Sequence, residues 1–119
     1  GMCEARASDH GLQIFFEQSN SVAQILEWIH KAIEDCDGLI INAGAFTHTS
    51  LAILDALKNV HCPIIEVHIS NPHQRESFRH HSYVTFAATG SIVGLGTRGY
   101  ILAIDALAEM LMDLESTAL

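Results

Sequence analysis

The sequence predicts an α/β fold with a parallel sheet and helices on both of its faces. Two short apolar runs, at residues 39–41 and 63–65, lack the alternation of a half-exposed strand. Continuous apolar runs of this kind are typical of parallel strands that are buried on both faces. Segments with helical periodicity lie between or after them, and this alternation of strands and helices indicates the α/β class.

The first third of the chain predicts a helix, a strand and a second helix. Residues 2–9 have helical composition and are followed by Gly11 as a stop signal, and residues 12–17 alternate as a strand does. Residues 21–24 form a capping-box pattern that begins the second helix, which Gly38 is expected to end. The apolar face of this helix is expected to comprise Val22, Ile25, Leu26, Ile29 and Ile33.

The remaining elements follow in the same alternation. Residues 39–41 are a buried strand, the next helix carries Leu51, Leu54 and Leu57, and residues 63–67 form the following strand. Residues 90–94 form the last strand. The final helix is expected to bury one stripe, made of Tyr100, Ile104, Leu107, Leu111 and Leu114.

Length and charge limit the classes of protein and partner. The 119 residues are expected to form one domain, residues 1–119, and no apolar run is long enough to cross a membrane. Six basic against fourteen acidic residues give a formal charge of −8, which disfavours nucleic acid and anionic membranes as partners. Three cysteines without a C-x-x-C pair predict reduced thiols and a cytoplasmic location.

Polar residues gather where strands are expected to end. Glu66 and His68 share one face of the 63–67 strand end, so the carboxylate can orient the imidazole ring. Arg75 and Arg79 follow at a spacing of four, which suits a grip on a small anion. The simpler interpretations are that His68 is a hydrogen-bonded core residue and that Arg75 and Arg79 form a solvated basic face. Because open α/β sheets bind ligands beyond the carboxyl ends of their strands, the functional interpretation is favoured.

Two other patterns are weak. Residues 94–99 match G-x-G-x-x-G, but no strand follows and no acidic strand end lies about twenty residues on, so close packing at a tight turn is favoured over a nucleotide cofactor. Eight histidines include no H-E-x-x-H or H-x-H pair, so no metal site is expected. His10, His30 and His61 are expected to be exposed surface residues.

Four segments together resemble type II 3-dehydroquinate dehydratase. They are INAGAFTHTS at residues 41–50, IEVHISN at 65–71, the segment from Arg75 through FRHHS at 78–82, and GSIVGLG at 90–96 with Gly99-Tyr100. The resemblance covers essentially the whole chain, in order and with the expected spacing. It implies a flavodoxin-like, three-layer α/β/α fold that assembles as trimers packed into a dodecamer.

The resemblance also implies a reaction and a set of site residues. The reaction is dehydration of 3-dehydroquinate to 3-dehydroshikimate through an enolate, in the shikimate or quinate pathway, without metal or cofactor. His68 matches the general acid, supported by Glu66, and Asp55 matches a residue that reaches a neighbouring subunit's site. The positions that match substrate binding, or lie beside it, are Asn42, His48, Ile69, Ser70, Arg75 and Arg79.

The sequence departs from the family pattern at its start. The family begins with a strand carrying Asn-Gly-Pro-Asn-Leu, followed by a loop with a catalytic arginine and tyrosine, and neither is in this sequence. We therefore expect the first, central strand of the sheet to be missing, and the residues present supply no obvious base. A catalytically inactive relative that binds small anions or only assembles is the alternative, and a flavodoxin-like nucleotide binder is a weaker third one.

Overall fold

The computed structural model describes residues 2–15, 17–18, 21–42, 51–69 and 87–118, and side chains as far as residue 113. The elements in chain order are α1 (Met2–Asp9), α2 (Val22–Asp35), β1 (Leu39–Ile41), α3 (Leu51–Leu57), β2 (Ile64–His68), β3 (Gly90–Val93) and α4 (Arg98–Ala118). Three of the four predicted strands, at residues 39–41, 63–67 and 90–94, therefore correspond to β1, β2 and β3.

The strands form one parallel sheet in the order β1-β2-β3. β2 lies in the centre, where Ile41 of β1 pairs with Glu66, and Glu66 in turn pairs with Ser91 of β3. Four of the five residues of β2 are buried, and the strand end, His68, is partly buried. The carboxyl ends of β1 and β2 therefore meet at one edge of the sheet.

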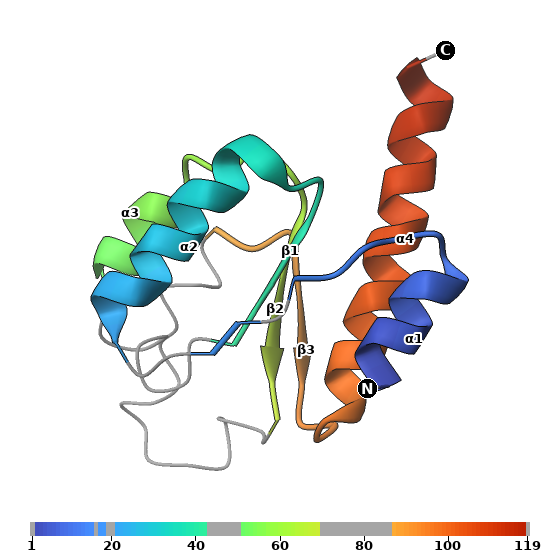
Figure 1. The fold of residues 1–119 in the computed structure, drawn as a ribbon, viewed down its shortest axis with the longest axis horizontal. Helices are drawn as coiled ribbons and strands as arrows, with labels where there is room; N and C mark the ends of the chain where they lie inside the picture. The colour runs from blue at the N-terminus through green and yellow to red at the C-terminus, as the bar shows by residue number, and fades with distance from the viewer. Residues whose placement is uncertain (1, 16, 19–20, 43–50, 70–86, 119) are drawn as a thin grey trace.

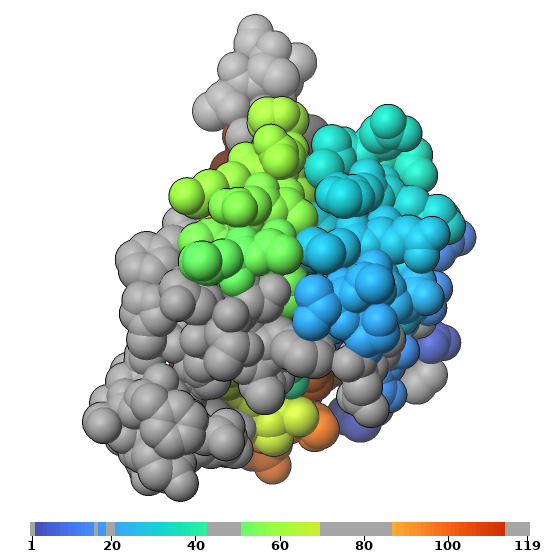
Figure 2. All heavy atoms as spheres, turned by 90° about the vertical axis from the view of Figure 1, so that its left-hand side faces the viewer, coloured from blue at the N-terminus to red at the C-terminus, as the bar shows by residue number. Residues whose placement is uncertain are grey.

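Helices cover both faces of this sheet, which confirms the predicted three-layer arrangement (Figure 1). α2 and α3 pack against one face, and Figure 2 shows them side by side over it. Ile29, Ile53 and Leu57 are the buried centre of that layer, whereas Leu51 at the start of α3 is exposed. On the other face, α4 packs Ala103 and Leu107 against the inward side chains of β2.

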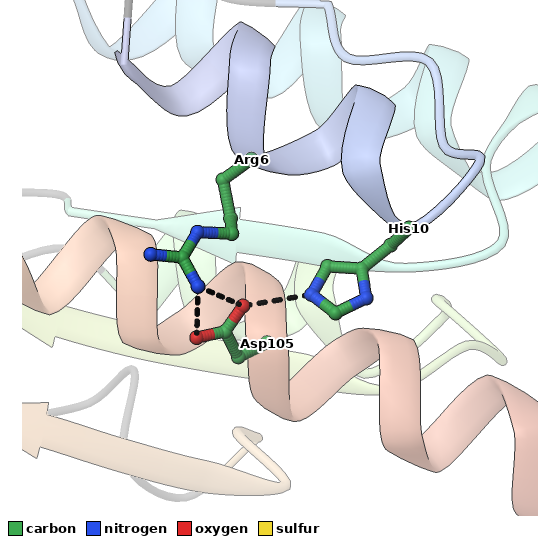
Figure 3. A network of polar contacts seen from close by, with 3 residues as sticks. All are labelled: Arg6, His10 and Asp105. Carbon is green, nitrogen blue, oxygen red and sulfur yellow. Dashed lines mark hydrogen bonds and ion pairs between the residues drawn. The ribbon is translucent and has the colours of Figure 1, made fainter.

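α1 is attached to the outer side of α4 by a small charged cluster (Figure 3). Arg6 Nη1 lies 3.4 Å from Asp105 Oδ2, and His10 Nε2 lies 2.8 Å from Asp105 Oδ1. Ala7, 2% exposed, is the buried residue of α1 beside these contacts. A carboxylate of α4 thus holds two side chains that are far away in the sequence.

The second helix begins as predicted and ends earlier than predicted. Ser21 caps α2, and its hydroxyl accepts a hydrogen bond from the Gln24 backbone N–H at 3.4 Å. The helix ends at Asp35 because Cys36 has extended backbone angles, so Gly38 lies beyond the end. Gly38 instead packs against Leu107, whose Cδ2 would lie 3.1 Å from an added Cβ.

The prediction of a strand at residues 12–17 is wrong for the residues that the structure describes there. Leu12 and Ile14 are half-buried while Gln13 and Phe15 are exposed, so the alternation in the sequence is real. A strand also needs a hydrogen-bonded neighbour, and within the described part of the chain β1 pairs only with β2.

Among the described residues, no helix combines the length and apolar character needed to cross a membrane. The segment that contains Arg75 and Arg79, between β2 and β3, lies outside these residues.

Candidate active site

The centre of the candidate site is a carboxylate–imidazole pair at the end of β2. His68 Nε2 lies 2.6 Å from Glu66 Oε2, as the spacing of two residues on one strand face predicted. The Glu66 side chain is 2% exposed and that of His68 is 11% exposed. When Glu66 is ionised, its carboxylate only accepts hydrogen bonds, and the Nε2–H of His68 is then the donor. The other ring nitrogen, Nδ1, is therefore the atom that can exchange a proton with a ligand.

The second oxygen of Glu66 has a partner on the neighbouring strand. Ser91 Oγ donates a hydrogen bond of 2.8 Å to Glu66 Oε1, and the two residues are direct register partners across β2 and β3. A buried carboxylate is costly unless donors satisfy its oxygens, and here at least one donor contacts each oxygen. The three side chains thus form a short chain from Ser91 through Glu66 to His68.

A second polar contact lies at the end of β1. Asn42 directly follows Ile41, and its Nδ2 donates a hydrogen bond of 2.9 Å to the hydroxyl of Tyr100 in the first turn of α4. Since Ile41 pairs with Glu66, Asn42 and His68 lie at the same edge of the sheet. This juxtaposition is the one that the parallel topology predicted.

The glycine-rich turn between β3 and α4 closes beside the pair. Gly94 N–H donates to the His68 carbonyl at 3.0 Å, and Gly96 N–H donates to the Ile69 carbonyl at 2.9 Å. Both glycines have positive φ, 82° and 61°, which side chains disfavour. Gly99 lies against Val67, whose Cγ1 would be 3.0 Å from an added Cβ. The G-x-G-x-x-G pattern is therefore explained by turn geometry and close packing, as favoured from sequence.

The structure places part of the predicted residue set. Ile69 follows His68 and is 45% exposed, and Asp55 is an exposed residue of α3. His10, His30 and His61 are exposed residues, as expected, although His10 is also bound to Asp105. The remaining predicted site residues lie outside the described part of the chain: His48, Ser70, Arg75 and Arg79.

Sequence reasoning missed two members of this arrangement. Ser91 has no local signal, because its position opposite Glu66 depends on the register of two strands that are 25 residues apart. Tyr100 was predicted only as part of a buried stripe, and it is partly buried with its hydroxyl bound to Asn42.

The cysteines and acidic residues indicate no further chemistry here. The three cysteines form no disulfide, and burial raises the pKa of the Cys36 and Cys62 thiols, with a contribution from the nearby charge of Asp37. A raised pKa leaves a thiol protonated and a poor nucleophile. Among the side chains that the structure describes, no group of His, Cys, Asp and Glu is arranged to hold a metal ion.

Comparison with known proteins gives one consistent family. The model of the family "Dehydroquinase class II" matches residues 1–108. The chain is 53% identical over 108 residues to 3-dehydroquinate dehydratase 2 of Agrobacterium fabrum, covering 91% of this chain and 74% of that one. The 3-dehydroquinate dehydratase of Mycobacterium tuberculosis is 52% identical over the same shares of each chain.

Solved structures agree with the sequence comparisons. The type II dehydroquinase of Propionibacterium acnes superimposes with a TM-score of 0.87 at 42% identity, covering 91% of this chain and 79% of that one. A 3-dehydroquinate dehydratase-like protein from Bifidobacterium longum gives a TM-score of 0.76 at 38% identity, covering 92% and 82%. The chain spans about three quarters of the length of its sequence relatives.

Proposed function

The chain belongs to the class II dehydroquinase family, and on this premise we propose that it dehydrates 3-dehydroquinate to 3-dehydroshikimate. The observation that carries the proposal is the buried Glu66 carboxylate held 2.6 Å from His68 at the end of the central strand. An imidazole oriented in this way can deliver a proton to a ligand at the sheet edge. Its neighbours supply polar groups for a hydroxylated substrate.

His68 acts as the general acid in the second half of the reaction. Loss of a proton from the carbon beside the substrate ketone gives an enolate, and collapse of the enolate breaks the bond to the leaving hydroxyl. His68 donates its proton to that oxygen, so the departing group leaves as water. Glu66 stabilises the positive charge on the imidazolium before this transfer and fixes its ring plane.

Substrate binding is assigned through the family pattern. Asn42 offers a carboxamide at the sheet edge where His68 also lies, and its contact with Tyr100 limits the directions in which that carboxamide can lie. The proposal includes His48, the backbone at Ile69 and Ser70, and the arginines Arg75 and Arg79 as further substrate contacts. Bidentate arginine contacts suit the substrate carboxylate and hydroxyls.

Binding without turnover is the second candidate, and a specific observation favours it. No side chain described around His68 and Asn42 is an evident base for the first proton transfer, since the Tyr100 hydroxyl is engaged with Asn42. A protein of this kind would retain the acid pair and the anion contacts and would bind substrate or product without converting it.

Turnover of 3-dehydroquinate, followed as enone absorbance, tests both candidates. We expect turnover by this chain and a loss of about 10²–10⁴-fold in His68→Ala, the usual contribution of a general acid. His30→Ala, an exposed histidine of α2, is the matched control and should keep the full rate. Equal rates in both variants would refute the role of His68. If the chain binds product but does not turn over 3-dehydroquinate, the second candidate, binding without turnover, is supported. If it neither binds nor converts these molecules, the family function is rejected for this chain.

The proposal also covers organisation and location. Residues 1–119 act as one domain, supported by two apolar clusters that share a single sheet. We propose a homo-oligomer of trimers within a dodecamer, in which Asp55, exposed on α3, reaches a neighbouring subunit's site. Sedimentation velocity of the chain and of Asp55→Ala tests this, because a monomer would exclude it. Three thiols without a disulfide support a cytoplasmic location.

A further inference from the structure

We propose that Ser91 is a positioning residue for the Glu66–His68 pair: its hydroxyl holds the buried carboxylate so that Oε2 faces the imidazole. The inference rests on the proposed function for its kinetic consequence only. Its structural part concerns the state of His68 in the protein without substrate. Ser91 belongs to β3, a different strand from the pair that it would control.

The geometry makes Ser91 part of a three-residue chain. Ser91 Oγ lies 2.8 Å from Glu66 Oε1, and His68 Nε2 lies 2.6 Å from Glu66 Oε2. A carboxylate rotates about its terminal side-chain bond, a torsion with broad and roughly two-fold preferences. Fixing one oxygen by a strand neighbour therefore fixes the other. Because β2 and β3 are hydrogen-bonded, the sheet sets the position of the Ser91 backbone directly opposite Glu66.

The charge state of Glu66 gives the second part of the argument. The residue is 1% exposed, and burial in a low dielectric disfavours its ionised form. A hydroxyl that donates to the carboxylate favours the ionised form again. Only the ionised form can accept the His68 Nε2–H at Oε2 and also stabilise a positive imidazolium. Removing the hydroxyl therefore weakens both the orientation and the proton-donating state of His68.

Ser91→Thr and Ser91→Val form a matched pair for the test. Threonine and valine have nearly the same shape, and only threonine retains the hydroxyl. Both are favoured in strands, and Ser91 is an exposed residue, so the additional methyl groups have room. Equal unfolding midpoints of the two variants in urea would show that any difference in function comes from the hydroxyl.

The kinetic readout separates positioning from substrate binding. We expect kcat for 3-dehydroquinate to fall by about tenfold in Ser91→Val, the size of one hydrogen bond to a charged group, with KM unchanged. Ser91→Thr should recover most of the lost rate. Equal kcat values for the two variants would overturn the proposal.

A spectroscopic readout distinguishes failure of this inference from failure of the proposed function. In protein labelled with 15N-histidine and sedimented for magic-angle-spinning NMR, the His68 Nε2–H should give a low-field proton signal, assigned by its loss in His68→Gln. We expect the signal in Ser91→Thr and its shift to higher field in Ser91→Val. If the two variants differ in this signal but the chain shows no turnover, only the enzyme activity is rejected. Identical spectra of the two variants would reject the role of Ser91.

Discussion

Gly99→Ala tests whether close packing of α4 on β2 supports the active-site pair. An added Cβ would lie 3.0 Å from Val67 Cγ1 and 3.4 Å from Ile92 Cγ2, which is tighter than ordinary contact. Val67 is fully buried and β-branched, so its methyl group cannot rotate away easily. The helix or the strand must shift instead.

The expected destabilisation follows from two opposing effects. Overpacking of a dense core costs about 1–3 kcal/mol. Alanine is favoured over glycine within a helix by about 0.8–1 kcal/mol, and by less in the first turn, where Gly99 lies. We therefore expect Gly99→Ala to lower the free energy of unfolding by about 1–2 kcal/mol. Urea unfolding at one protein concentration, with an unchanged m value, measures it.

A double-mutant cycle identifies the clash as the cause. Val67→Ala alone should cost about 2 kcal/mol by leaving a cavity. In the double variant the new methyl group of residue 99 fills that space. The loss of unfolding free energy in the double variant should therefore be at least about 1 kcal/mol smaller than the sum of the two single losses. Gly38→Ala is the control: its Cβ would meet the flexible end of Leu107 at 3.1 Å, and that end can move. Additive losses, or a Gly99→Ala variant as stable as the parent, would refute the reasoning.

Three further predictions concern the surroundings of the site. Tyr100→Phe removes the acceptor of the Asn42 Nδ2 hydrogen bond. It should raise KM for 3-dehydroquinate about three- to tenfold, and the unfolding midpoint should not change because the contact is exposed. A fall in kcat that is larger than the rise in KM would contradict this expectation. Asp105→Asn breaks the charged cluster between α1 and α4. It should lower the free energy of unfolding by about 0.2–1 kcal/mol at low salt, measured by urea unfolding, and the difference from the parent should vanish at high salt. Burial raises the pKa of the Cys36 and Cys62 thiols, so at alkaline pH the folded protein keeps protons that the unfolded chain releases. The free energy of unfolding should therefore fall as pH rises above about 8.5. Alanine at both positions should remove that pH dependence.

Local patterns in the sequence were sufficient for most of the fold. Buried runs, a capping serine and helical spacing identified the three strands and the helices α1 to α4, because each depends on neighbours a few residues away. The two-residue spacing of Glu66 and His68 is local in the same sense, and the predicted contact is confirmed at 2.6 Å.

Features that depend on distant partners were not predictable in this way. Residues 12–17 have the alternation of a strand, yet alternation describes only which side chains face the core and not which backbone completes the ladder. Ser91 depends on strand register, and the Asn42–Tyr100 contact depends on how α4 docks. Each of these needs the relative position of two elements, which a single sequence does not specify.

The two faces of β2 explain how packing and chemistry are combined in one strand. Successive residues point to opposite faces, so Ile65 and Val67 contact α4, while Glu66 and His68 point to the other side. Val67 lies between the two site residues, and its Cγ1 would be 3.0 Å from a Cβ added at Gly99. Any shift of α4 is therefore transmitted through the backbone of Val67 to both members of the pair. We therefore expect Gly99→Ala to lower kcat together with stability, whereas Gly38→Ala should leave kcat unchanged.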